Sequence, residues 1–285
     1  MTLTVSQNFF WHKKSTCISM QKKIKRLEME KFMNTKPKIN KYKNIFLLCT
    51  FCALVQIKCY GYWDPIETFL DENVTVLNDS NYSELKTKTV DFLKGSWCSE
   101  EKTNLLMDLV AIFRPNVCVE IGAWEGGSVI PIAQTLKYLG SGKVFAVDAW
   151  SNEWAVKYLV QDEPNKNWWK TVNMKAVHDL FSSRISHLDL SKFCIEIHKP
   201  SVEAADLLTE IDFLHLDGDF SETGSKHDIE LFLPKVKQGG YILISNVQMC
   251  IEGQFPKSEA FNDLLRSCEM IAAIDHDNAI LFQKN

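Results

Sequence analysis

Three acidic residues lie where short runs of β-branched and other apolar residues come to an end: Glu120, Asp148 and Asp217. Such runs are typical of buried strands, and open α/β sheets bind ligands at the carboxyl ends of their strands. A carboxylate at that edge can accept hydrogen bonds from ribose hydroxyls. It can also take a proton from an acceptor hydroxyl. Asp217 is the best candidate for a general base, because it is expected to face the site.

A glycine-rich turn follows the first of these runs. It reads Gly122-Ala123-Trp124-Glu125-Gly126-Gly127 and leads to Ser128, which we expect to cap the next helix. Glycines let the backbone approach a ligand closely. The turn lacks the G-x-G-x-x-G spacing of dinucleotide sites, and Glu120 would repel a pyrophosphate. The pattern therefore favours a ligand with an amino group or ribose hydroxyls and disfavours a nicotinamide oxidoreductase.

Strand-like and helix-like segments alternate along most of the chain. We expect seven strands, at 117–121, 143–147, 194–197, 211–216, 241–244, 270–274 and 279–282. We expect helices between them, among others at 99–113, 128–139, 201–208 and 259–266. Strands separated by helix-length segments indicate a parallel sheet with helices on both faces. The predicted fold is α/β and Rossmann-like, with a seven-stranded, mostly parallel sheet and an antiparallel strand at its carboxyl-terminal edge.

Charge and cysteine usage exclude some classes of protein. Residues 1–43 hold 11 Lys and Arg against two acidic residues, so with a net charge of -4 the remainder is acidic. An acidic body argues against nucleic acid as a partner, because phosphate binding needs a basic face. The nine cysteines are scattered without zinc-site spacing, which favours structural thiols.

The amino-terminal part has the features of a targeting segment. Residues 45–57 are almost entirely apolar and follow a lysine-rich stretch, as in a secretory signal peptide. We divide the chain into a basic tail or over-extended start (1–32), a signal peptide or membrane anchor (33–61), a helical lead-in (62–98) and the main domain (99–285). The expected location is exported or membrane-associated through residues 45–57, or cytoplasmic if that segment is not functional.

At this point the sequence resembles the class I S-adenosylmethionine-dependent methyltransferases, over about residues 86–285. VCVEIGAWEGGSVIPIA is similar to their first motif, and VFAVDAW to the acidic loop after their second strand. The region IDFLHLDGDFSETGSKHDIELFLPKVKQGGYILISNV is similar to the fourth and fifth strands of a bacterial subgroup, and the catechol-type O-methyltransferases share the general plan. The resemblance implies S-adenosylmethionine as cofactor, bound through Glu120, Gly122, Trp124, Gly126, Ser128, Asp148, Trp150 and Ser201.

The chain departs from the metal-dependent relatives at two places. Their LDGD turn usually continues with His, and their fifth strand ends in Asp-Asn or His-Asp. Here those places hold Phe220 and Ser245-Asn246. Asp217 and Asn246 are weak candidates for metal ligands, because magnesium prefers more carboxylate charge. We therefore expect no divalent metal.

Several residues have two interpretations. The tryptophans Trp150, Trp154, Trp168 and Trp169 fit a substrate pocket and core packing equally well. His215 is expected to be a buried structural histidine, and His227 an exposed one. The leading hypothesis is a methyltransferase that acts on a hydroxyl of a small molecule, a sugar or a phenol. The alternative is a non-catalytic exported or membrane-tethered binding protein that retains the fold. The sequence is silent on the oligomeric state.

Overall fold

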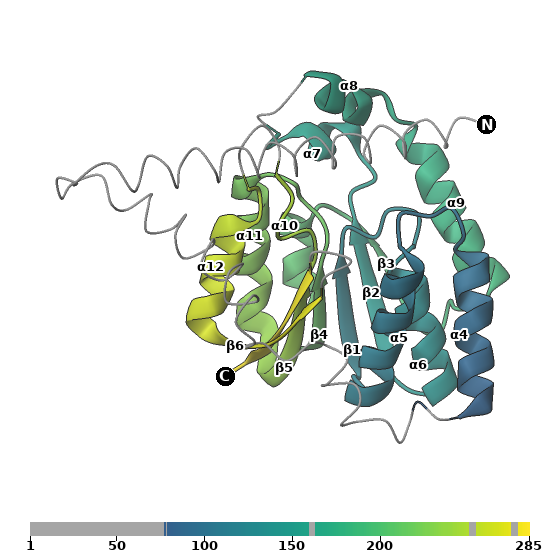
Figure 1. The fold of residues 1–285 in the computed structure, drawn as a ribbon. Coiled ribbons are helices and arrows are strands. Elements are labelled where there is room, and N and C mark those ends of the chain that lie inside the picture. Colours follow the sequence, from purple (N-terminus) through teal and green to yellow (C-terminus); the bar gives the residue numbers. More distant parts are fainter. Residues whose placement is uncertain (1–76, 78, 160–162, 251–254, 275–278) are drawn as a thin grey trace, which may run out of the picture. The chain divides into compact units, whose positions relative to one another are not determined.

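A computed structural model describes residue 77 and residues 79–159, 163–250, 255–274 and 279–285 (Figure 1). The predicted basic tail (1–32), the targeting segment (33–61) and its apolar core (45–57) lie outside the described residues and stay predictions. Within the ranges that the structure describes, no helix is both long enough and apolar enough to cross a membrane.

One seven-stranded sheet forms the centre of the domain, with strand order β3-β2-β1-β4-β5-β7-β6. The strands are β1 (Val117–Ile121), β2 (Lys143–Asp148), β3 (Cys194–His198), β4 (Ile211–Leu216), β5 (Val236–Ile244), β6 (Cys268–Ile274) and β7 (Ala279–Lys284). Strands β1 to β5 are parallel, and β7 pairs antiparallel with both β5 and β6. The predicted fold is confirmed. The antiparallel strand β7 lies between β5 and β6, so β6 forms the edge.

The strand order places a topological switch point between β1 and β4. From β1 the chain proceeds through β2 to β3 on one side, and β4 and β5 extend the sheet on the other. Ligands of open α/β sheets bind at such a point, beyond the carboxyl ends of the strands. The turn after β1 and the turn after β4 meet there.

Helices cover both faces of the sheet, with α4, α5, α6 and α9 on one side and α10, α11 and α12 on the other (Figure 1). Their bounds are α4 (Ser80–Phe92), α5 (Glu100–Phe113), α6 (Val129–Leu139), α7 (Asn152–Val156), α8 (Glu163–Thr171), α9 (Met174–His187), α10 (Ser201–Ala204), α11 (Glu222–Phe232) and α12 (Ser258–Ser267). The short helices α7 and α8 follow β2, so they lie beyond the carboxyl ends of the parallel strands.

Helix α5 shows why these segments are helical. The Ser99 hydroxyl caps the helix by accepting a hydrogen bond from the Lys102 amide at 3.1 Å, and two acidic residues occupy the first turn. Leu106, Leu109 and Val110 recur at helical spacing and are fully buried. The helix packs against α6, whose residues belong to the same core.

Three local expectations were wrong. Ser128 makes no capping hydrogen bond, because its hydroxyl donates to Glu120 instead. The segment expected as one helix over 201–208 is α10 followed by a 3-10 turn, Ala205–Leu207. The strand expected at 241–244 begins at Val236, so Gly239 and Gly240 lie inside β5. They accompany an irregularity in the pairing of β4 with β5, which is where glycine occurs within strands.

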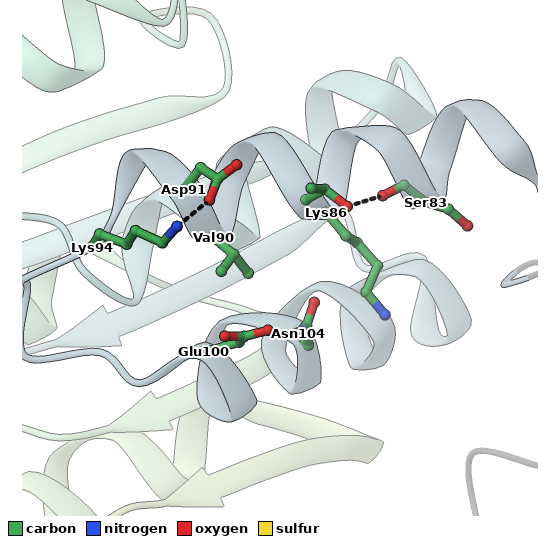
Figure 2. A pocket seen from close by; sticks show the side chains of 8 residues that line it. Ser83, Lys86, Val90, Asp91, Lys94, Glu100 and Asn104 are labelled. Atoms are coloured by element: carbon green, nitrogen blue, oxygen red, sulfur yellow. Dashed lines mark hydrogen bonds and ion pairs between the residues drawn. The ribbon is translucent and has the colours of Figure 1, made fainter.

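Helix α4, in the predicted helical lead-in, packs on α5 and α6. A groove between α4 and α5 is lined by Val90 and seven polar side chains (Figure 2): Ser83, Lys86, Thr87, Asp91, Lys94, Glu100 and Asn104. Its two lysines are already paired, Lys94 with Asp91 at 2.6 Å and Lys86 with Asp108 at 2.7 Å. The groove therefore offers no unpaired cation to a ligand, and we assign it no function.

Candidate active site

The turns after β1 and β4 contact each other through their backbones. Gly122 has a φ of 92°, which glycine adopts without strain. A Cβ atom added to Gly122 would lie 2.7 Å from the Gly218 Cα and 2.9 Å from the Asp217 carbonyl oxygen. Any side chain at Gly122 would separate the two turns. The glycine therefore brings the first-strand turn next to Asp217, as the sequence predicts for a ligand site.

Asp148 holds the loop after β2 to the glycine turn. Its carboxylate accepts one hydrogen bond from the Trp124 amide at 2.9 Å and one from the Trp150 amide at 2.8 Å. Burial raises the pKa of Asp148, and these two N–H donors oppose that rise. Each carboxylate oxygen has more than one lone pair, so Asp148 can accept further hydrogen bonds. Its half-buried side chain remains available to hydroxyl donors.

Backbone strain marks three of the strand-end loops. Trp124 follows β1, Trp150 follows β2 and Asn246 follows β5, and all three have positive φ values of 49°, 39° and 61°. Non-glycine residues in this region cost about 1–3 kcal/mol each and cluster at functional sites. Their shared position at one edge of the sheet supports the site that the acidic residues define.

Glu120 lies in a buried chain of hydrogen bonds that joins β1, β4 and the end of β5. One carboxylate oxygen accepts from the Ser128 hydroxyl at 2.5 Å, and the other lies 2.5 Å from Nδ1 of His215. Nε2 of His215 lies 2.8 Å from the Ser245 hydroxyl, and none of Glu120, His215 and Ser245 is exposed. His215 is thus the buried structural histidine that we expected.

The carboxylate of Glu120 faces the neighbouring strand rather than an open site. A charged group in a buried strand needs a partner, and Glu120 finds it in His215 and Ser128 instead of a ligand. The predicted contacts of the Glu120 and Ser128 side chains with a cofactor therefore stay predictions that this geometry disfavours. The structure assigns both side chains to holding the glycine turn in place.

Asp217 is bound by a lysine that the sequence analysis did not single out. Lys102 of α5 donates to one carboxylate oxygen at 2.6 Å, and the Asn246 amide donates to the other at 2.6 Å. The side chains of Lys102 and Asp217 are 8% and 20% exposed. Burial opposes ionisation of both groups, but the charge of each partner prevails. The pKa of Asp217 is therefore lowered and that of Lys102 raised.

A second buried lysine, Lys257, lies at the same strand end. It is 3% exposed, and its ammonium donates to the Leu216 carbonyl oxygen at 3.4 Å. Burial lowers the pKa of Lys257, while the charges of Asp217, Asp228 and Asp219 oppose that shift. Lys102 and Lys257 together make this end of β4 less acidic than the aspartates alone suggest.

Four tryptophans stack beside the glycine turn. Trp97 stacks on Trp124 with ring centroids 4.9 Å apart, and Trp168 and Trp169 pack against both at centroid distances of 5.5–6.1 Å. Trp97 is 41% exposed. We call Trp97, Trp124, Trp168 and Trp169 the tryptophan cluster. It borders the site, which favours the substrate-pocket interpretation for Trp168 and Trp169.

The other predicted residues have structural environments. Trp150 is 6% exposed and packs on Phe181, so its side chain belongs to the core. A Cβ atom added to Gly126 would lie 3.2 Å from the Phe181 ring, so this glycine serves packing in the turn. Ser201 begins α10 and hydrogen bonds to the carboxyl group of Asp228, whose pKa burial raises to about 7.

Trp154 and His227 also contact other side chains. Trp154 lies under the Lys157 ammonium, 3.6 Å from the ring centroid. His227 is half-buried rather than exposed, and its ring packs edge-on to Tyr158.

The candidate metal ligands are engaged by other groups. One ligand atom each of Glu120, His215 and Asp217 lies within 4.8 Å of the others. Both ring nitrogens of His215 are engaged inside the protein, Nδ1 by Glu120 and Nε2 by Ser245. Asn246 directs its amide nitrogen, a donor, toward Asp217. The donor set at this position therefore fits hydrogen bonding better than coordination of a hard cation, which requires oxygen ligands.

Comparisons with known proteins agree with this architecture. Residues 119–247 match a protein family described as a methyltransferase domain. The O-methyltransferase NovP has the same fold, with a TM-score of 0.52 and 16% identity over 66% of this chain and 81% of NovP. No curated protein matches the sequence.

Two further solved structures are similar at lower scores. An O-methyltransferase from Bacillus cereus in complex with SAH shares 16% identity over 78% of this chain and 98% of its own, with a TM-score of 0.48. TomG from Streptomyces achromogenes, an O-methyltransferase in complex with SAM, shares 12% identity over 78% of this chain and 96% of TomG, with a TM-score of 0.46. Residues 119–247 thus match the methyltransferase-domain family, and the sheet around them has the fold of the O-methyltransferase NovP.

Proposed function

We propose that this chain is an S-adenosylmethionine-dependent methyltransferase that modifies a hydroxyl group of a small molecule. The observation that carries the proposal is the switch point between β1 and β4, where two carboxylates, Asp148 and Asp217, flank a glycine turn in backbone contact with the β4 turn. The methyltransferase-domain match over residues 119–247 supports it.

The chemistry of the donor set fits this cofactor. Its ribose hydroxyls are donors, and Asp148 has acceptor capacity left after its two backbone bonds. The cofactor's carboxylate can accept from Lys102. Asp148, Lys102 and the backbone after Gly122 would therefore hold it.

The cofactor supplies an electrophilic methyl group, so the protein mainly has to position the acceptor and receive its proton. Asp217 is the proposed proton acceptor. Because Lys102 holds its pKa below the usual range, Asp217 is ionised at neutral pH and is a weak base. A weak base suffices when the hydroxyl proton becomes acidic as the oxygen acquires the methyl group. Lys102 and Asn246 fix the orientation of the carboxylate.

The tryptophan cluster supports a flat, apolar acceptor such as a phenol. Aromatic side chains line most small-molecule sites, and an exposed Trp97 at the edge of this cluster offers a stacking surface. We further propose that the reaction proceeds without a divalent metal. Lys102 already supplies a positive charge at Asp217, where the metal of related enzymes would have to bind.

Asp148→Ala tests the cofactor site. We expect the affinity for S-adenosylmethionine to fall about tenfold or more, because at least one charge-assisted hydrogen bond to the ribose is lost. Isothermal titration calorimetry of the folded variant measures this. The matched control is Asp179→Ala, which removes an exposed surface carboxylate paired with Lys175 and should leave affinity unchanged. Equal affinity in the two variants would remove Asp148 from the site.

A further inference from the structure

A second group of metal-ligating side chains lies on α9 and on the edge strand β3, next to the carboxyl end of β2, where His198 is the register partner of Asp148. His178 of α9 and Glu196 and His198 of β3 each place one nitrogen or carboxylate oxygen within 4.8 Å of the other two. Nε2 of His178 lies 2.7 Å from a Glu196 carboxylate oxygen. Alternate residues of a strand point to the same face, so Glu196 and His198 are both directed toward α9.

The hydrogen bond made by His198 prepares its ring for a metal. Nε2 lies 3.1 Å from the Ala149 carbonyl oxygen, which can only accept, so Nε2 carries the proton. Nδ1 is then left with its lone pair. Metal-binding histidines commonly donate their other ring N–H to a backbone carbonyl in this way, which fixes both the tautomer and the orientation of the ring.

Packing holds both imidazole rings in place. Trp150 contacts the His178 ring at a centroid distance of 4.5 Å and the His198 ring at 5.2 Å, and the two imidazoles lie 4.5 Å apart. Trp150 itself is buried and hydrogen bonds through its indole to the Trp124 carbonyl oxygen at 2.9 Å. The rings thus rest on a fixed support, whereas the open side of the group remains exposed to solvent.

We propose that His178, Glu196 and His198 form a binding site for a first-row divalent metal ion such as Zn²⁺. Two imidazole nitrogens and one carboxylate oxygen are a ligand set that suits zinc, and an exposed position leaves a coordination site for water. Nitrogen and oxygen ligands at zinc's usual bond lengths lie about 3.3 Å from one another. The ligand atoms here lie within 4.8 Å, so small rotations of the exposed Glu196 and His198 side chains bring them to that spacing. The ion would join α9 to the edge strand β3.

The proposal is tested by calorimetric titration of the chelator-treated, full-length chain with ZnCl₂. We expect His178→Ala and His198→Ala each to weaken one binding event about tenfold or more. The control His187→Ala changes a histidine of the same helix that lies outside the group and should bind like the wild type. Because the chain has other histidines and cysteines, the difference between these variants and the control is the result that counts.

Binding of Co²⁺ is a second measurement of the site, because the visible absorption of Co²⁺ changes when nitrogen and oxygen ligands bind it. We expect the spectrum of the wild type to be lost in His198→Ala and retained in His187→Ala. If an alanine variant fails to fold, His178→Gln or His198→Gln replaces it with a side chain of similar size. No zinc binding by the wild type, or binding that is equal in all the variants, overturns the proposal.

Discussion

Turnover should fall at least about 100-fold when Asp217 is replaced by Asn, with the affinity for S-adenosylmethionine changed much less. The amide has nearly the same shape as the carboxylate and can still accept a hydrogen bond from Lys102. It cannot take the proton of the acceptor hydroxyl, and it lacks the charge that orients Lys102. Methyl transfer to a catechol-type acceptor, followed by detection of S-adenosylhomocysteine, measures turnover.

The comparison requires a folded variant, because the substitution also leaves Lys102 without its ion pair. Circular dichroism measures the folded fraction of each variant, and each rate is divided by that fraction. Asp179→Asn, at an exposed position on α9, is the matched control and should retain full turnover. Turnover of Asp217→Asn equal to that of the control would exclude Asp217 as the proton acceptor.

Replacing Lys102 by Met should lower the free energy of unfolding by about 3–5 kcal/mol. Methionine retains the buried stem of Lys102 but leaves Asp217, only 20% exposed, without its cation. Urea denaturation measures the loss. The double variant Lys102→Met/Asp217→Asn should recover part of it, since no unpaired charge remains. If the loss of unfolding free energy in the double variant equals the sum of the losses in Lys102→Met and Asp217→Asn, the two side chains are not coupled.

The pH dependence of this loss follows from the direction of the two pKa shifts. The lowered pKa of Asp217 contributes stability that is present above its unfolded-state value and lost as the pH falls through the folded-state value. The raised pKa of Lys102 contributes stability below its unfolded-state value, which is lost at strongly alkaline pH. The stability difference between wild type and Lys102→Met should therefore be largest near neutral pH and shrink in acid.

The fold could be predicted from the sequence because its signals are local. The run Val117–Ile121 is a buried strand whichever helices surround it, and Ser99 caps α5 through an amide three residues away. The turn after β1 was recognisable because its glycines occupy backbone conformations that other residues adopt only under strain. Asp148 was placed correctly at a strand end because it closes a run of apolar residues and is the last residue of β2.

The partners of the acidic residues could not be predicted, because they depend on strand register and helix packing. Glu120 meets His215 only because β1 and β4 are adjacent and these two residues are in register. Lys102 meets Asp217 across 115 residues of sequence. One signal was present: Lys102 precedes Leu105, Leu106 and Leu109 at helical spacing, so a charge lies on the buried face of α5. A lysine on such a face needs an acidic partner.

The central claim is tested most directly by titrating the full-length chain with S-adenosylmethionine and, separately, S-adenosylhomocysteine in a calorimeter. We predict that one molecule of either ligand binds with about micromolar affinity and raises the melting temperature. We also predict that Asp148→Ala lowers the affinity for both ligands. A well-folded chain that gives neither heat nor a thermal shift would contradict the account and would leave a methyltransferase fold that serves as a binding protein.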